Sequence, residues 1–340
     1  MSARRVGFGV GDEFSHYRLE EEIGKGGMGV VFRALDLDLD RTVAIKVMAA
    51  GAATGKKERD RFTREARNLA RVDHPHVLPI HEVKDHEGRL YLAMRLVPSG
   101  YTLRGLLRRR SALAPGHALT LLEKVGGALD AMHRADVLHL DVKPENILLE
   151  GLEGGEHPWL ADFGLARARS DEVTRSDQIV GTVRYMAPEQ LGGARDIDAH
   201  ADLYAFALVL YETLTGHLLD LVQRSRVPES LPENDLVNGR LREVFGRALA
   251  PLPAERYESA AALIADARDA FSRAAAPLAM SAPDERTTEP PGPYPGSRRS
   301  SSGAEPITTS GRKRRHRLTA ALVAAVIVAG LGISAYFIER

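Results

Sequence analysis

Cysteine is absent from this 340-residue chain. Its absence excludes disulfides, cysteine-ligated metal sites and thiol catalysis, and it fits a reducing compartment. An excess of one charge is lacking too, because 46 Lys and Arg balance 46 Asp and Glu. The chain as a whole therefore gives no electrostatic argument for nucleic acid, and we expect no such partner. The N-terminal stretch lacks the apolar region of a signal peptide, so none is expected.

Composition divides the chain into three zones. Residues 17–271 mix apolar periodicity with turn signals and are interpreted as globular, and the hydrophobic content of 44% is enough for a sizeable core. Residues 275–317 are rich in Pro, Ser, Thr and Gly and end in the basic run Arg312–Arg317, so we interpret them as a disordered juxtamembrane linker. An uncharged apolar run, Leu318–Ile338, follows.

This apolar run is long enough for a transmembrane helix, which needs about 20 residues. A buried core helix is the alternative, but it would follow a disordered linker with no domain around it. The basic run Arg312–Arg317 could be solvated charge, a nucleic-acid patch or the cytoplasmic flank of a span, and its position beside an apolar run favours the flank. The prediction is a single-pass protein of the cell membrane, with the globular zone in the cytoplasm, the C-terminus outside, and anionic headgroups attracted to the flank.

Secondary-structure signals change midway through the globular zone. Short β-rich segments between turns predict strands at Tyr17–Ile23, Val30–Leu35, Thr42–Val47, Leu78–Val83 and Leu90–Val97. One helix, Glu58–Val72, is expected among them. After Thr102 helical patterns dominate, at Ala118–Ala135, Ala199–Thr215, Leu241–Leu249 and Ala260–Phe271. A small β-rich lobe followed by a larger helical lobe predicts an α+β fold with a cleft between the lobes.

A glycine-rich run, Gly24–Val31, lies between the first two predicted strands and reads GKGGMGVV. Glycines let backbone N–H groups approach phosphate oxygens without a Cβ in the way. A dinucleotide-binding loop would lead from a strand into a helix, which this run does not. The remaining alternative to a phosphate-binding loop is an ordinary turn.

Lys46 ends the sequence VAIK on the third predicted strand, and Glu65 lies on the helix that follows. The simpler interpretation is a solvent-facing lysine and a glutamate that pairs with Arg61 one helical turn away. The functional interpretation is a Lys46–Glu65 ion pair that holds the ammonium group against the α- and β-phosphates of a nucleotide.

The densest polar cluster is His139–Asn146, HLDVKPEN, which lies directly before an apolar segment. Asp141 could orient a hydroxyl and accept its proton, Lys143 could neutralise a moving phosphoryl group, and Asn146 could bind a metal. A solvated loop is the alternative. Asp162, in the sequence DFG after a strand-like segment, is a plausible Mg²⁺ ligand.

Further along the chain, Ala187–Glu189 reads APE, and Arg256 is a candidate buried partner for Glu189. In this order the motifs GKGGMGVV, VAIK, a helical Glu, HxDxKPEN, DFG and APE resemble the signature set of protein kinases, over residues 17–271. The sequence DVKPEN is similar to Ser/Thr rather than Tyr kinases, and the whole chain resembles the bacterial eukaryotic-like (Hanks-type) Ser/Thr kinases, which are often membrane-anchored.

This resemblance implies a two-lobed fold and transfer of the ATP γ-phosphoryl group to Ser and Thr hydroxyls of protein substrates. It implies catalysis by Asp141 and Lys143, and Mg²⁺, or Mn²⁺ in its place, on Asn146 and Asp162. It also implies that Asp202 anchors the catalytic loop. The implied nucleotide-binding residues are Ile23, Gly24, Lys25, Gly26, Gly27, Met28, Gly29, Val31, Ala44, Lys46, Glu65, Met94, Leu96 and Leu148.

One departure from the family pattern bears on regulation. Leu140 stands where these kinases usually have an arginine that pairs with a phosphorylated activation loop. Thr174 and Ser176 resemble the autophosphorylated stretch of bacterial relatives, and we expect phosphate there to raise activity only modestly. Ordinary loop hydroxyls are the alternative.

Two rival functions share this fold. A pseudokinase scaffold would bind nucleotide or partners without catalysis, but every residue needed for chemistry is present. A small-molecule kinase would not need the APE segment, which resembles part of a peptide-binding platform. Dimerisation is left open by the sequence.

Overall fold

The computed structural model describes residues 8–27, 29–49, 55–151, 154–162, 183–194, 196–224 and 239–274. The expected linker (275–317), the expected transmembrane helix (318–338), Met28, Thr174 and Ser176 therefore lie outside the described residues. No helix within the described part of the chain is long and apolar enough to cross a membrane.

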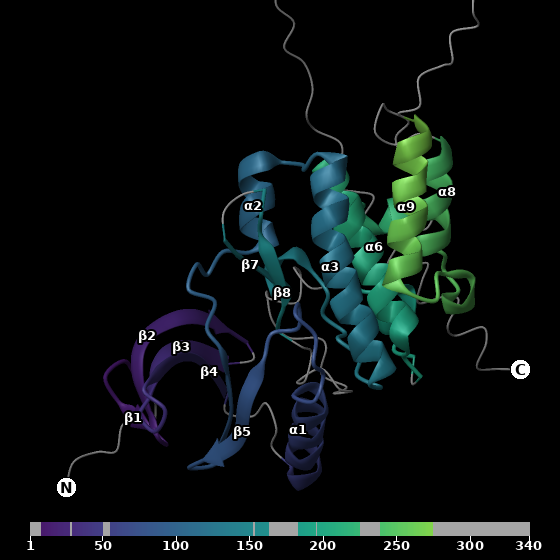
Figure 1. Cartoon of the computed structure of the whole chain (residues 1–340). Helices are drawn as coiled ribbons and strands as arrows, with labels where there is room; N and C mark the ends of the chain where they lie inside the picture. Colours follow the sequence, from purple (N-terminus) through teal and green to yellow (C-terminus); the bar gives the residue numbers. More distant parts are fainter. Residues whose placement is uncertain are drawn as a thin grey trace, which may run out of the picture. The chain divides into compact units, whose positions relative to one another are not determined.

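An antiparallel sheet forms the first lobe (Figure 1), with strand order β1-β2-β3-β4-β6-β5. Its strands are β1 (Glu13–Phe14), β2 (Tyr17–Gly26), β3 (Gly29–Asp36), β4 (Arg41–Met48), β5 (Ile80–His86) and β6 (Arg89–Arg95). Alternating apolar residues of β2, β3 and β4 form one core with Phe14 and Tyr91. The five strands expected from the sequence are all present, with their ends shifted by a few residues.

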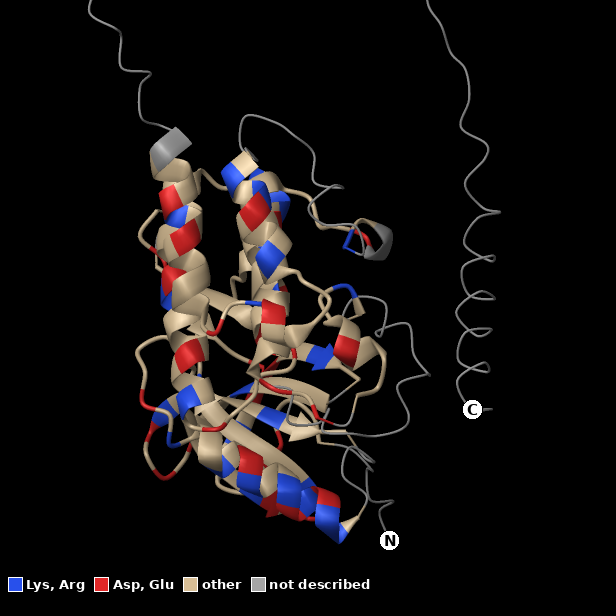
Figure 2. Ribbon diagram, turned by 90° about the vertical axis from the view of Figure 1, so that its right-hand side faces the viewer, with Lys and Arg blue, Asp and Glu red and all other residues tan. Residues whose placement is uncertain are grey.

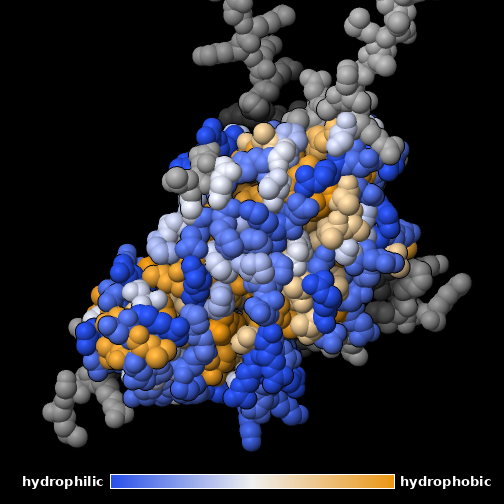
Figure 3. Space-filling view, viewed as in Figure 1, coloured by the Kyte–Doolittle hydropathy of each residue, from blue (hydrophilic) through white to orange (hydrophobic). Residues whose placement is uncertain are grey.

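Helix α1 (Lys56–Leu69) is the helix of this lobe. It begins at Gly55, whose N–H donates to Glu58 Oε2 at 3.0 Å. Its buried residues, Phe62, Ala66 and Leu69, recur at helical spacing and give the helix one apolar face. Charges of both signs cover the rest of α1 (Figure 2), and its surface is accordingly hydrophilic in Figure 3. The helix therefore packs through one stripe and leaves its other faces in solvent.

Helices build the second lobe around α6 (Ala199–Thr215), which is buried over nearly its whole length. The other helices are α2 (Leu103–Arg110), α3 (Pro115–Arg134), α5 (Pro188–Leu191), α7 (Leu221–Arg224), α8 (Gly239–Ala248) and α9 (Ala260–Ala274). Asp198 caps the start of α6 by accepting the His200 N–H, and Gly216 ends it with a left-handed φ of 74°. One continuous apolar core joins α2, α3, α6, α8 and α9.

A short hairpin, β7 (Ile147–Glu150) and β8 (His157–Leu160), follows the 3₁₀ turn Pro144–Asn146. Backbone hydrogen bonds attach it to both lobes: Leu149 N–H donates to Tyr101 O, and Leu78 N–H donates to Leu160 O. The polar loop before β7 and the residue after β8 are thereby fixed between the sheet and the helices.

Candidate active site

Three polar side chains of the loop before β7 meet at Asp141. Lys143 Nζ lies 2.8 Å from Asp141 Oδ2, and Asn146 Nδ2 donates to the same oxygen at 3.0 Å. Asn146 Nδ2 also donates to the Asp141 carbonyl at 2.8 Å, which closes the loop on itself. The three residues expected to carry chemistry in this loop are thus gathered at one point.

The backbone of this loop is held from α6. Asp202 Oδ2 accepts the N–H of His139 at 2.8 Å, and Asp202 Oδ1 accepts the N–H of Leu140 at 2.6 Å. His133 Nε2 lies 2.9 Å from the same carboxylate. Asp202 therefore has the anchoring position that the resemblance implies, and its buried charge is surrounded by donors.

His139 is completely buried and joins the loop to the end of β8. Its Nε2 lies 3.1 Å from Ala161 O, and the Asp141 N–H donates to its Nδ1 at 3.3 Å. These contacts suit a neutral imidazole with its proton on Nε2. Burial lowers the pKa of His139, because the cationic form would lose its hydration.

Asp162 follows β8 and reaches across to β4. Its Oδ1 lies 2.7 Å from Lys46 Nζ, and its carbonyl accepts Asn146 Nδ2 at 3.4 Å. Asp162 and Leu140 both adopt positive φ values, 58° and 60°. Such strained backbone is typical of functional sites, and both residues here flank the same polar cluster.

The donor set suits a hard divalent cation. Asp162 supplies a carboxylate and Asn146 an amide oxygen, and these come from loops that contact each other. Within the described residues, no cluster of three or more His, Cys, Asp or Glu side chains could hold a metal alone. One carboxylate and one amide oxygen fit Mg²⁺, which usually takes one or two carboxylates together with phosphate oxygens.

The expected ion pair between Lys46 and Glu65 is not formed in this structure. Lys46 pairs with Asp162, while Glu65 Oε1 lies 3.7 Å from Arg61 Nε, one helical turn away on α1. The helical partner that the sequence offered as the alternative is thus the one observed. Burial raises the pKa of Glu65, which Arg61 and Arg64 partly offset. Pairing with Lys46 would require this side chain to leave Arg61.

Five of the expected nucleotide-binding residues gather in one apolar cluster. Ala44 of β4 and Met94 of β6 are buried members, and Val31, Leu96 and Leu148 pack against them from β3, the inter-lobe segment and β7. Ile23 differs, because it is 45% exposed and does not belong to the cluster. Among the remaining expected nucleotide residues, Gly24, Lys25 and Gly26 lie at the end of β2, and Gly27 follows.

Packing requires a glycine at position 29 of this run. Its φ is 145°, and a Cβ there would lie 2.1 Å from the Val47 carbonyl oxygen of β4. Gly24 has no comparable constraint, since a Cβ there would make only ordinary contacts with Val31. At Gly29 a structural reason for glycine therefore exists beside the functional one.

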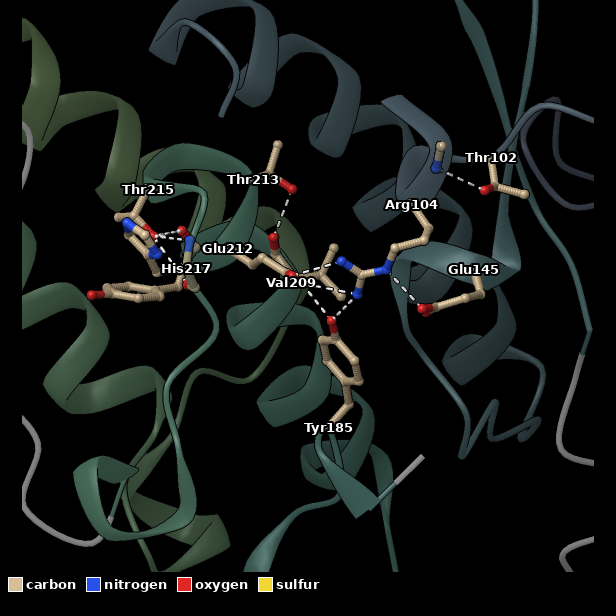
Figure 4. A network of polar contacts seen from close by, with 11 residues as sticks. Thr102, Arg104, Glu145, Tyr185, Val209, Glu212, Thr213, Thr215 and His217 are labelled. Carbon is tan, nitrogen blue, oxygen red and sulfur yellow. Dashed lines mark hydrogen bonds and ion pairs between the residues drawn. The ribbon is translucent and has the colours of Figure 1, made fainter. Parts of the chain in front are cut away.

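A network around Arg104 was not foreseen from the sequence (Figure 4). Arg104 of α2 reaches Glu145 of the catalytic loop with Nε at 2.7 Å and Glu212 of α6 with Nη1 at 2.7 Å. Tyr185 contacts both Arg104 and Glu212 through its hydroxyl. Hydrogen bonds to Glu212 and Glu145 raise the pKa of Arg104 against the opposing effect of burial. The sequence drew attention to Glu145 as part of the HLDVKPEN cluster, but it did not indicate Arg104, which is remote in the sequence, as its partner.

The Glu189–Arg256 pair suggested by the sequence is present, with Arg256 buried and Glu189 mostly buried. Arg256 Nη1 and Nη2 lie 2.7 and 2.8 Å from the two carboxylate oxygens of Glu189. Its remaining donors reach the carbonyls of Ala250, His200 and Pro251. This arginine joins α5 to the start of α6 and to the turn before α9.

Comparison with known proteins shows the family of this chain. The protein kinase domain family matches residues 17–232. The chain is 38% identical to Serine/threonine-protein kinase PknE of Mycobacterium bovis over 274 residues, which are 78% of this chain and 48% of PknE. It is 35% identical to PknH of Mycobacterium tuberculosis over 301 residues, 84% of this chain and 47% of PknH. The chain spans about half the length of these curated relatives.

A solved structure of a kinase domain has the same fold. The crystal structure of the Mycobacterium tuberculosis PknI kinase domain superposes with a TM-score of 0.60 at 30% identity, covering 77% of this chain and 99% of that domain. The domain match over residues 17–232 and the likeness to these relatives show that the chain belongs to the protein kinase domain family.

Proposed function

We propose that this protein is a Ser/Thr protein kinase that transfers the γ-phosphoryl group of ATP to Ser and Thr hydroxyls of proteins. The observation that carries the proposal is the cluster of Asp141, Lys143, Asn146 and Asp162, joined by contacts of 2.8, 3.0 and 3.4 Å. Asp141 orients the hydroxyl and accepts its proton, and Lys143 neutralises charge on the transferred group. The names of the curated relatives, Serine/threonine-protein kinases, support the choice of substrate hydroxyl.

The remaining residues of the site hold the nucleotide in this proposal. Val31, Ala44 and Leu148 enclose the adenine, and Lys46 contacts the phosphates. Mg²⁺, or Mn²⁺, held by Asp162 and Asn146 would neutralise phosphate charge when bound. A pseudokinase lacks support, because none of the catalytic side chains is replaced.

The test is phosphoryl transfer from labelled ATP to a generic protein substrate by the full-length chain. Asp141→Asn and Lys46→Met should each abolish transfer, whereas Glu123→Gln, a change on the exposed side of α3, should not. Turnover by Asp141→Asn comparable to that of the wild type would overturn the assigned roles. Nucleotide binding without transfer in the wild type would favour a scaffold, and transfer only to small molecules would favour the other rival.

We further propose that residues 318–338 anchor the protein in the cell membrane, with the kinase domain in the cytoplasm. The support is the uncharged apolar run beside the basic run Arg312–Arg317. The protein should stay with membranes after alkaline and high-salt washing, and removal of the residues after Ser310 should release it. Full-length protein that washes off would contradict the anchor.

For regulation we propose autophosphorylation at Thr174 or Ser176 with a modest effect on activity. Leu140 supports the modest effect, because its apolar side chain cannot bind a phosphate. Mass spectrometry of wild-type and Asp141→Asn protein would locate the phosphates. Loss of nearly all activity in a Thr174→Ala/Ser176→Ala double variant would contradict this account.

A further inference from the structure

Arg95 lies where the chain leaves the sheet lobe. It is the last residue of β6, pairs in register with Val43 of β4, and donates its N–H to Pro79 O at 2.9 Å. Its neighbours Met94 and Leu96 belong to the apolar cluster proposed to hold the adenine. The backbone of Arg95 therefore moves with the sheet.

The Arg95 side chain, in contrast, contacts the β7–β8 hairpin. Its Nη2 lies 3.2 Å from both carboxylate oxygens of Glu150, the last residue of β7. Its guanidinium carbon lies 4.9 Å from the centroid of the Trp159 indole on β8. Trp159 Nε1 donates to Glu150 Oε2 at 2.9 Å, so the three side chains form a closed set of contacts.

Strand β7 of the hairpin is fixed to the segment that leads into the helical lobe, while β8 is bound to the segment before β5 through Leu78 N–H and Leu160 O. Leu149 N–H donates to Tyr101 O at 2.7 Å, and Ser99 Oγ donates to Leu149 O at 2.7 Å. The contacts of Arg95 thus join the sheet to a hairpin that is attached to the segment leading into α2. Between Arg95 and Ser99 the chain passes through Leu96, Val97 and Pro98.

The charges of Arg95 and Glu150 favour these contacts at neutral pH. The hydrogen bond from Trp159 lowers the pKa of Glu150, and Arg95 lowers it further, so this carboxylate is ionised at neutral pH. The Arg95 side chain is 43% exposed and that of Glu150 32%, and a pair this exposed adds little to global stability. Its effect is expected on the relative position of the two lobes.

We propose that Arg95, held by Glu150 and Trp159, is a positioning residue that restrains opening of the two lobes and so lengthens the residence of the nucleotide. The reason is geometric. The apolar cluster has members on β4 and β6 on one side and on β7 and β8 on the other. Separation of those strands would open the cluster, and the same movement would pull Arg95 away from Glu150 and Trp159. The inference rests on the proposed function, because it presumes that the cluster binds ATP and ADP.

The test measures dissociation of a fluorescent ADP analogue, with Mg²⁺, from the full-length chain by stopped flow. Arg95→Leu and Glu150→Gln should each speed dissociation about threefold to tenfold, in the range that a cation–π contact and an assisted hydrogen bond support. Arg95→Lys keeps a cation but loses the planar guanidinium that contacts both oxygens of Glu150 and lies over Trp159, so its dissociation rate should fall between those of the wild type and Arg95→Leu.

The matched control is Arg268→Leu. It removes an arginine of the same exposure, 43%, from an ion pair with Glu123 that lies within the helical lobe. The ADP analogue should dissociate from this variant at the wild-type rate. An effect seen in Arg95→Leu alone would then come from restraint of the two lobes and not from the loss of a surface ion pair in general.

The chain's only tryptophan gives an independent readout. Emission from Trp159 should change in Arg95→Leu and stay unchanged in Arg268→Leu. A changed emission in Arg95→Leu with wild-type dissociation would overturn the inference, because the contact would then be lost without effect on the nucleotide. A wild-type chain that does not bind the ADP analogue would instead overturn the proposed function on which the inference rests.

Discussion

The carboxylate of Asp202 holds Leu140 in a backbone conformation that leucine rarely adopts. Leu140 has a φ of 60°, and its N–H donates to Asp202 Oδ1 at 2.6 Å. A non-glycine residue in this region costs on the order of 1–3 kcal/mol. The turn that presents Asp141 is therefore stabilised from α6, in a part of the chain remote in sequence.

Asp202→Asn should weaken this turn. The amide keeps one acceptor but places an NH₂ group against a backbone N–H, which leaves buried donors unsatisfied. We expect the free energy of unfolding to fall by about 1–3 kcal/mol. We also expect kcat to fall at least about tenfold, because Asp141 loses its fixed position. Urea unfolding and phosphoryl-transfer rates measure the two effects.

Asp198→Asn is the matched control for this change. Asp198 caps the same helix at an exposed position, and asparagine is an equally good cap. Asp202→Asn protein with the stability and kcat of Asp198→Asn protein would show that the carboxylate is not required.

Local patterns explain why much of the fold was predictable. Strand alternation and the helical stripe of α1 depend on near neighbours, and motif order located Asp141, Asn146 and Asp162. Strand β1, with two residues, is too short for any periodic signal, and α2 carries a glycine and a run of arginines that obscure its pattern.

Ion pairs and hydrogen bonds between side chains far apart in the sequence were less predictable. Glu65 has cations within reach on its own helix and on β4, and the sequence does not say which one it meets. The Arg104 network joins α2, the catalytic loop, Tyr185 and α6, so no local pattern could reveal it. The Glu189–Arg256 pair, in contrast, was a candidate from the sequence.

Arg256→Ala should be strongly destabilising. The Arg256 side chain is 0% exposed and that of Glu189 13%, so removal of the arginine leaves a mostly buried carboxylate unpaired. We expect a loss of about 3–5 kcal/mol in the free energy of unfolding, measured by chemical denaturation.

Two further variants separate charge from packing at this pair. Arg256→Met with Glu189→Gln removes both charges and should cost less than Arg256→Ala alone. Arg33→Ala, at an exposed pair with Glu20, should change stability by no more than about 0.5 kcal/mol. Equal losses in Arg256→Ala and Arg33→Ala would contradict the importance of the buried pair.

Buried His139 should make stability depend on pH. Its pKa is lowered in the folded state, so the unfolded chain binds the proton more readily. The contribution of His139 is fully present above its unfolded pKa of about 6.5 and is lost as pH falls toward the folded value. The free energy of unfolding should therefore decrease as pH is lowered from about 7 to 5.

His139→Asn removes this titrating group and should reduce the slope of unfolding free energy against pH, by at most about 1.4 kcal/mol per pH unit. Burial also lowers the pKa of His74, His76 and His81, so part of the slope should remain. A slope in His139→Asn as steep as in the wild type would show that His139 does not contribute.

Glu65 tests whether the observed ion pairs must rearrange for turnover. Glu65 pairs with Arg61 and Lys46 with Asp162, yet the proposed mechanism needs Lys46 at the phosphates. If Glu65 positions Lys46 during turnover, Glu65→Gln should lower kcat about 10- to 100-fold, equivalent to ~1.4–2.7 kcal/mol of transition-state stabilisation. Stability should change little, because the half-exposed Arg61–Glu65 pair joins neighbouring turns of one helix at 3.7 Å.

Arg61→Ala discriminates between the two partners of Glu65. It removes the same helical pair but leaves the carboxylate available to Lys46, so kcat should be equal to or above that of the wild type. Steady-state kinetics and thermal unfolding of both variants provide the comparison. Equal losses of kcat in Glu65→Gln and Arg61→Ala would mean that the pair with Arg61 is itself the functional arrangement. Loss of kcat in Glu65→Gln alone would mean that Glu65 leaves Arg61 for Lys46 when the kinase turns over.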